Sequence, residues 1–152
     1  MKLSAHTDIA ASVNEAFAVL SDFAQFEKIA LRQGAEVERT DNLRGYGIGS
    51  SWSAHFRFRG KARHLVTELT QLEPPRGLGF QGKSNGFEFT VVLSLVPLAQ
   101  RITRLNVDVD VRPRTLAARI VLQTAKLGRV RIEQRFASRI AAFGRFLQQR
   151  LA

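Results

Sequence analysis

The beginning of the chain changes from an alternating hydrophobic pattern to a helical one. Within residues 3–11 every second position is apolar or threonine, which predicts a half-buried strand. Ser12 and Glu15 then match a capping box, in which each side chain satisfies a backbone N–H group of the first helical turn. We therefore expect a helix after Ser12 and a second short helix that ends in a left-handed cap at Gly34. The residues expected to face the core from these helices are Val13, Ala16, Phe17, Leu20, Phe23, Phe26 and Ile29.

The middle of the chain, residues 35–112, shows the pattern of strands joined by turns. Residues 50–60, 87–96 and 103–112 carry apolar side chains at every second position. Such one-sided alternation indicates antiparallel strands with one face in water. Turn-forming residues, such as those at 74–77 and 84–86, separate the strands. We expect about six consecutive strands in this segment.

The C-terminal segment has a helical period, but its apolar side changes along the sequence. Thr115 is the residue that we expect to cap its first helical turn. A straight helix that is buried on one side cannot change its apolar face, so we predict a break or kink near Gly128, or a first half that meets a different surface. The residues on the first apolar side are Leu116, Ile120, Leu127 and Val130, and those opposite are Ile132, Phe136, Ile140, Phe143, Leu147 and Leu151.

Together these elements predict one α+β domain spanning residues 1–152. Its order is one strand, two short helices, about six strands and a long terminal helix, so the sheet would have about seven strands. A curved antiparallel sheet wrapped around the long C-terminal helix is the architecture that this order favours. A chain of 152 residues is long enough to build one hydrophobic core.

Composition narrows the chemistry and the compartment. The chain has no cysteine, which excludes disulfides, thiolate catalysis and cysteine-bound metals. His6, His55 and His64 have no carboxylate or second histidine at metal-ligand spacing, so we expect neither a metal nor another cofactor. The polar residues near the N-terminus do not fit a signal peptide, and we expect the protein to be cytoplasmic.

The positive charge is concentrated at one end of the chain. Residues 112–152 contain ten Lys or Arg and one Glu, so they carry +9 of the formal net charge of +10. An electrostatic partner is expected to meet this segment first.

The order of elements resembles the helix-grip fold of the START-like, or SRPBCC, superfamily. Residues 9–17, IAASVNEAF, and residues 20–23, LSDF, resemble the opening of its polyketide cyclase/dehydrase and lipid-transport branch. The resemblance covers essentially the whole chain and implies an apolar cavity between the sheet and the long helix. In that superfamily such cavities hold lipids, sterols, polyketides or plant hormones, and a few branches are enzymes. No branch-specific catalytic motif is present here, so the resemblance implies no catalytic residue.

The aromatic residues could line such a cavity or fill a solid core. The chain has 11 Phe, one Trp and one Tyr, many at inward strand positions. Large rigid rings can wall a concave space, but they can equally pack to native density. The family resemblance favours the cavity, with Arg139 as the one candidate for a polar anchor. The predicted walls are Trp52, Phe56, Phe58, Phe87, Phe89, Val91, Phe136, Ile140 and Phe143.

The leading hypothesis is therefore a protein that binds a hydrophobic small molecule, either lipid-like or polycyclic. A cyclase or aromatase-type enzyme is the first alternative. The second is a peripheral binder of anionic membrane that uses the basic C-terminal helix. Nucleic acid is not an expected partner, because the aromatics are not interleaved with the arginines. The sequence does not predict an oligomeric state.

The glycine-rich segment 45–49 superficially resembles a phosphate-binding loop. No helix follows it, so the N-terminal amide groups that such a loop requires are missing. A flexible hairpin near the cavity mouth, able to gate access, is the preferred interpretation.

Overall fold

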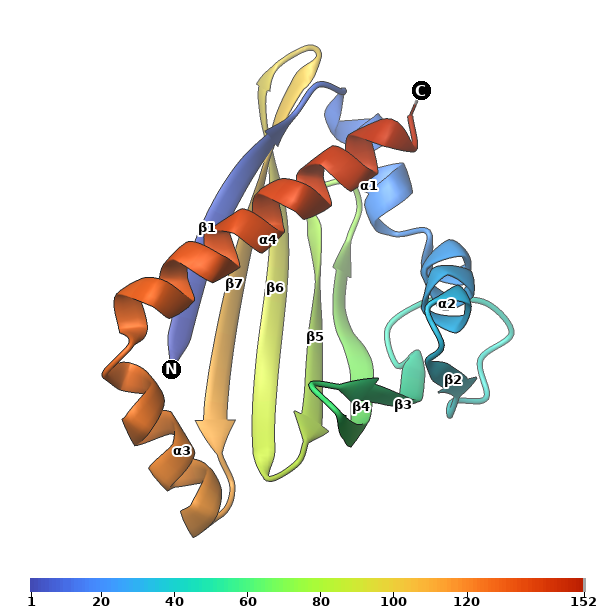
Figure 1. Ribbon diagram of the computed structural model, residues 1–152. Helices are drawn as coiled ribbons and strands as arrows, with labels where there is room; N and C mark the ends of the chain where they lie inside the picture. The colour runs from blue at the N-terminus through green and yellow to red at the C-terminus, as the bar shows by residue number, and fades with distance from the viewer. Residues whose placement is uncertain (152) are drawn as a thin grey trace.

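The computed structural model describes residues 1–151, which form an α+β structure in the predicted order (Figure 1). The seven strands are β1 (Lys2–Ile9), β2 (Glu36–Arg39), β3 (Ser51–Phe58), β4 (Lys61–Glu73), β5 (Gly77–Ser84), β6 (Phe87–Ala99) and β7 (Ile102–Pro113). The helices are α1 (Val13–Leu20), α2 (Phe23–Arg32), α3 (Leu116–Lys126) and α4 (Arg129–Gln149).

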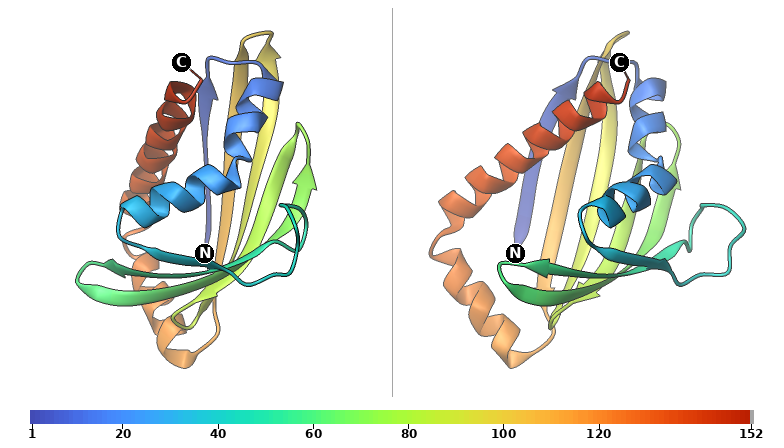
Figure 2. Two further views of the ribbon diagram at one scale, coloured as in Figure 1. Left: turned by 90° about the vertical axis from the view of Figure 1, so that its right-hand side faces the viewer. Right: turned by 45° about the vertical axis from the view of Figure 1, so that its right-hand side comes forward.

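All seven strands form one antiparallel sheet in the order β1-β7-β6-β5-β4-β3-β2. The register between β4 and β5 shifts between Leu69 and Gln71. An extra residue in one strand bends and twists a sheet locally. Beyond this point β3, β4 and β2 sweep forward beneath α2, so that the sheet is strongly curved (Figure 2).

Helix α4 crosses the concave face of this sheet and lies directly against β1 (Figure 1). A glycine makes the close approach possible, because a Cβ atom on Gly144 would lie 2.5 Å from Thr7 Cγ2. The Ala10 N–H group donates to Gln148 Oε1 at 2.9 Å and ties the end of the helix to the end of the strand. Leu147, the next inward position, is fully buried.

The N-terminal helices form as the sequence predicts. Ser12 Oγ accepts the Glu15 N–H at 3.2 Å and donates to Glu15 Oε1 at 2.9 Å. Gly34 follows α2 with φ of 92°, a conformation that glycine adopts without a steric penalty. The core lies between these helices, α4 and the concave face of the sheet, and includes Ile9, Phe17, Leu20, Leu69, Leu105 and Leu147.

The predicted break near Gly128 is confirmed, since α3 ends at Lys126 and α4 begins at Arg129. The two apolar sides of this segment differ in burial. The side of α4 packs against the core, whereas the apolar side of α3 faces solvent. No helix among residues 1–151 is both long and apolar enough to cross a membrane.

Candidate functional site

An apolar cavity of about 400 Å³ lies between α2 and the concave face of the sheet and is open to solvent. This volume falls within the range of ~300–1,000 Å³ that is typical of small-molecule sites. Among residues 1–151, the polar groups in its wall are the carboxylate of Glu27, the hydroxyl of Thr67 and the indole N–H of Trp52. The lining residues are Leu20, Phe23, Phe26, Glu27, Ala30, Val37, Trp52, Leu65, Thr67, Leu78, Phe80, Leu93 and Phe143.

The apolar lining distinguishes this cavity from other hollows of similar volume. A hollow of about 340 Å³ at β4, β5 and β6, for example, includes the charged residues Glu68, Lys83, Glu88 and Arg112. Charged residues on both sides of such a hollow favour water as its content, because an apolar guest would have to displace water from them.

Aromatic rings hold the wall of the cavity in place. The Phe23 ring lies 5.7 Å from the Trp52 ring and 6.2 Å from the Phe80 ring, and the latter contact is edge to face. From the other side, Phe26 of α2 lies 6.2 Å from Phe143 of α4. Such pairs are stabilising beyond the area that they bury. They link α2 to the sheet and to α4, so the wall does not depend on α2 alone.

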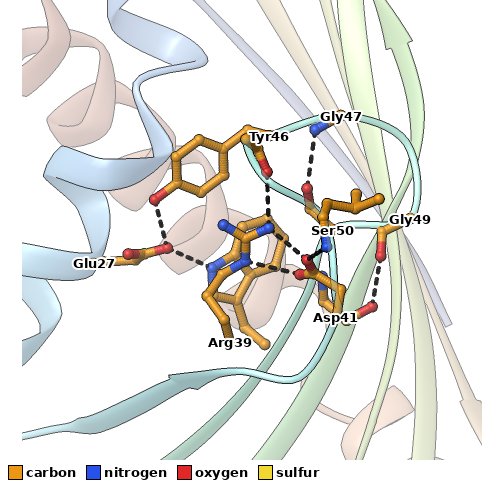
Figure 3. Close-up of polar contacts among 11 residues, drawn as sticks. Glu27, Arg39, Asp41, Tyr46, Gly47, Gly49 and Ser50 are labelled. Carbon is orange, nitrogen blue, oxygen red and sulfur yellow. Dashed lines mark hydrogen bonds and ion pairs between the residues drawn. The ribbon is translucent and has the colours of Figure 1, made fainter.

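Glu27 contributes the one charged side chain that the structure places in the wall of the cavity among residues 1–151 (Figure 3). Its Oε1 atom accepts two hydrogen bonds, from the Tyr46 hydroxyl at 2.9 Å and from Trp52 Nε1 at 2.8 Å. Burial, together with the bond to Glu27, raises the pKa of Tyr46. The Tyr46 hydroxyl therefore keeps its proton at neutral pH and remains a hydrogen-bond donor.

The segment that carries Tyr46 is fastened to the rest of the site by Arg39 and Asp41 (Figure 3). The Arg39 guanidinium donates to both Asp41 carboxylate oxygens, at 2.8 and 2.6 Å, and lies 4.5 Å from the centre of the Tyr46 ring. Asp41 also accepts the N–H groups of Leu43 and Ser51, at 2.9 and 2.7 Å. The Arg39 guanidinium holds the pKa of the Asp41 carboxyl well below its usual range. The carboxylate is thus charged at neutral pH and keeps these contacts.

These contacts change the interpretation of the glycine-rich segment 45–49. It lies beside the cavity, as the sequence predicts, because Tyr46 packs 5.5 Å from Phe23. Both of its ends are bound, however, since the Gly45 carbonyl accepts from Arg39 Nη2 at 2.9 Å and the Gly49 N–H donates to the Leu69 carbonyl at 2.8 Å. The structure therefore supports a fixed wall at this place and gives no support to a gate.

The structure places two of the ten predicted ligand residues, Trp52 and Phe143, in the wall of the cavity. Three more, Val91, Phe136 and Ile140, pack against the core. Phe89 lies across Gly82 of the neighbouring strand, where a Cβ atom would collide with its ring. Phe56 and Phe87 are half-buried beyond the lining of the cavity.

Phe58 and Arg139 were predicted to contact the ligand, but both lie away from the cavity. Phe58 is 46% exposed because it ends β3, past the part of the sheet that the helices cover. Arg139 is exposed on α4 and does not line the cavity. Both errors have one origin, since periodicity assigns a residue to a face of a strand or helix but not to a covered part of that face.

The residue of the cavity that periodicity could have indicated is Glu27. It lies four residues after Phe23 and three before Ala30, so the three share one face of α2. A carboxylate in an apolar helical stripe is a signal that the sequence contains. Tyr46, Arg39 and Asp41 give no comparable signal, because Tyr46 reaches Glu27, and Arg39 binds Asp41, only once the end of β2 and the β2–β3 connection are folded.

On the convex face the structure brings together two histidines that the sequence leaves apart. His55 and His64 are opposite each other in the β3–β4 hairpin, and their rings stack 4.1 Å apart. His64 Nε2 shares a hydrogen bond of 2.8 Å with Ser53 Oγ. Within residues 1–151, no group of three or more His, Asp or Glu has a geometry suited to a metal ion.

Residues 1–142 match the family described as polyketide cyclase/dehydrase and lipid transport. The match includes every residue that lines the cavity except Phe143 of α4. No curated protein sequence matches the chain significantly.

Several solved structures share the fold. The Zhui aromatase/cyclase from Streptomyces sp. R1128 is 16% identical, with a TM-score of 0.72 over 100% of this chain and 96% of that one. A START superfamily protein from Mycobacterium smegmatis is 17% identical, with a TM-score of 0.59 over 88% of this chain and 95% of that one. Norcoclaurine synthase from Thalictrum flavum is 12% identical, with a TM-score of 0.63 over 81% and 75%. At these identities the likeness shows the helix-grip fold and does not extend to activity.

Proposed function

This chain belongs to the polyketide cyclase/dehydrase and lipid-transport family, and on that basis we propose that it binds a hydrophobic small molecule in the cavity beneath α2. The guest would be lipid-like or polycyclic. It would lie between the inner side of α2, the floor formed by β3 to β6, and Phe143 of α4. We expect it to be bound in the cytoplasm, as the absence of cysteines suggests.

One observation carries this proposal, which is the apolar wall of a cavity that the side chains leave unfilled. An apolar guest would remove both its own surface and the wall from water, which is the main source of affinity in such sites. The wall is also preorganised, since the rings of Phe23, Trp52 and Phe80 support one another. A preformed wall lowers the entropic cost of binding.

The proposal is tested with Nile red, a neutral apolar dye that has no hydrogen-bond donor. We expect saturable binding with one dye per chain and a blue-shifted emission, together with an apolar molecule in organic extracts of protein purified from its host. Native mass spectrometry would give the stoichiometry. Protein that comes empty from its host and takes up no dye would overturn the proposal.

The alternative of a cyclase-type enzyme gains support from the Tyr46 hydroxyl, a protonated group that is bound to Glu27 at the cavity wall. Such a pair could protonate a substrate oxygen during cyclisation or dehydration. Conversion of a reactive polyketide that stops in Tyr46→Phe, while Nile red still binds, would favour the enzyme. Binding without turnover would favour the carrier.

A further inference from the structure

From the free oxygen of Glu27 we infer that the guest carries a hydrogen-bond donor, either a hydroxyl or an ammonium group, and is not a carboxylic acid. This inference rests on the proposed binding function and specifies its ligand class. Glu27 lines the cavity, and both hydrogen bonds that it accepts end on Oε1. Among residues 1–151 the structure records no bond to its second oxygen, Oε2.

A carboxylate oxygen in an apolar wall favours a donor on the guest for two reasons. A hydrogen bond to a charged group is stronger than one between neutral groups. A polar group that loses water without gaining a partner also weakens binding. A guest with a donor satisfies Glu27, whereas an anionic guest would be repelled by it. Glu27 therefore favours a guest with a hydrogen-bond donor, whereas an anchor at the positively charged Arg139 would have favoured an anionic guest.

The other charged groups near the cavity do not cancel this preference. Arg39 lies above the Tyr46 and Trp52 rings, but its guanidinium is already bound by Asp41. Arg63 is the one competitor. It lies two residues before the cavity residue Leu65, on the same face of β4, and its buried Nε has no hydrogen-bond partner within the described chain. Arg63 does not line the cavity, whereas Glu27 does.

Four pyrenes that differ in one substituent test the inference by fluorescence titration. They are 1-hydroxypyrene, 1-(aminomethyl)pyrene, 1-methoxypyrene and pyrene-1-carboxylate. We expect the two donors to bind about tenfold more tightly than the methyl ether, because their bond to Glu27 is charge-assisted. The carboxylate is expected to bind most weakly.

Glu27→Gln is the matched variant, because the amide oxygen can still accept from Tyr46 and Trp52. We expect it to lose most of the preference for the ammonium over the carboxylate. Equal ranking of the pyrenes by wild type and variant would overturn the inference while leaving the binding function intact. Tightest binding of the carboxylate would also overturn it and would point to Arg63. Failure of Nile red and of every pyrene would overturn both proposals.

A separate observation concerns α3, whose apolar side is uncovered. Its buried residue is Ala118, which is small, and the side opposite carries large apolar residues. These are between 55% and 89% exposed, and they continue across the break into the start of α4. We define the α3 patch as Leu116, Ile120, Leu127 and Val130.

We propose that the α3 patch docks on the surface of an anionic bilayer. Residues 111–132 contain six Arg or Lys and no acidic residue. Arg119 and Lys126 border the patch and form no ion pair within residues 1–151. An amphipathic helix with apolar side chains beside basic ones is the form that inserts into the headgroup region of anionic membranes. The charge therefore favours a bilayer over a second, equally basic copy of the chain as the occupant.

Flotation with vesicles tests this docking. We expect binding to vesicles of phosphatidylcholine with phosphatidylglycerol, little binding to phosphatidylcholine alone, and loss of binding as salt rises. The variant Leu116→Ser/Ile120→Ser/Leu127→Ser and the variant Arg119→Gln/Lys126→Gln are each expected to bind at least about tenfold more weakly. Leu98→Ser, at an exposed apolar residue of the distant β6–β7 hairpin, is the control and is expected to bind normally.

These substitutions alter exposed side chains, so the variants are expected to keep the wild-type melting temperature. Membrane docking would be overturned if the serine variant bound vesicles as tightly as the wild type, or if the wild type did not bind them. A wild-type dimer in light scattering that the serine variant dissociates would identify a second copy as the occupant and would likewise overturn it.

Discussion

Gly144→Leu is expected to destabilise the protein by about 3 kcal/mol, the upper end of the usual cost of overpacking. Even a single Cβ at this position would lie 2.5 Å from Thr7 Cγ2, inside the contact between α4 and β1. A leucine must therefore push the helix away from the strand or force Thr7 to move. For a chain of this length the melting temperature is expected to fall by roughly 10 °C, as measured by thermal unfolding.

A control and a rescue make this prediction specific. Ala142→Leu adds the same side chain to an exposed position of α4 and is expected to change stability by less than about 0.5 kcal/mol. Gly144→Ala is expected to be destabilising in the wild type but less so beside Thr7→Ala, which removes the obstructing atoms. Equal stability of Gly144→Leu and the wild type would contradict the close contact of α4 with β1.

The close contact matters for the site because it determines where α4 can lie. Gly144 and Leu147 hold the helix against β1, at one edge of the sheet. The opposite half of the concave face, over β3 to β5, is then covered by α2 instead. A short helix, with Ala30 toward the sheet, fills this space incompletely. The cavity is thus a consequence of unequal coverage of one curved sheet by two helices.

The elements themselves were predictable because local patterns determine them. The capping box of Ser12, the alternation in β1 and β7, and the change of apolar face at Gly128 each depend on residues close in sequence. The pairing of His55 with His64 was not predicted, although it too depends on residues close in sequence. A two-residue turn at Arg59 and Gly60, both with positive φ, sets the register of this hairpin, and the pair follows from it.

The cavity was less predictable, because it depends on contacts between distant segments. Trp52 and Glu27 are 25 residues apart, and Tyr46 joins them from a connection without regular structure. Sequence periodicity correctly assigned Phe89 and Val91 to the inner face, yet neither lines the cavity. Which inner residues meet a void depends on how far each helix extends over the sheet, and no local pattern contains that information.

Ala30→Phe is expected to abolish the binding of Nile red and of the pyrenes. Ala30 lines the cavity from α2, at the point where the wall has its smallest side chain, so a phenylalanine ring would occupy the space proposed for the guest. The same ring would bury apolar surface and remove part of a void, which commonly raises stability by ~0.5–2 kcal/mol. We therefore expect binding to be lost while the melting temperature stays equal or rises, a combination that unfolding cannot produce. Ala24→Phe, at an exposed position of the same helix, is the matched control and is expected to bind Nile red as the wild type does. Undiminished binding by a folded Ala30→Phe variant would contradict the location of the guest beneath α2.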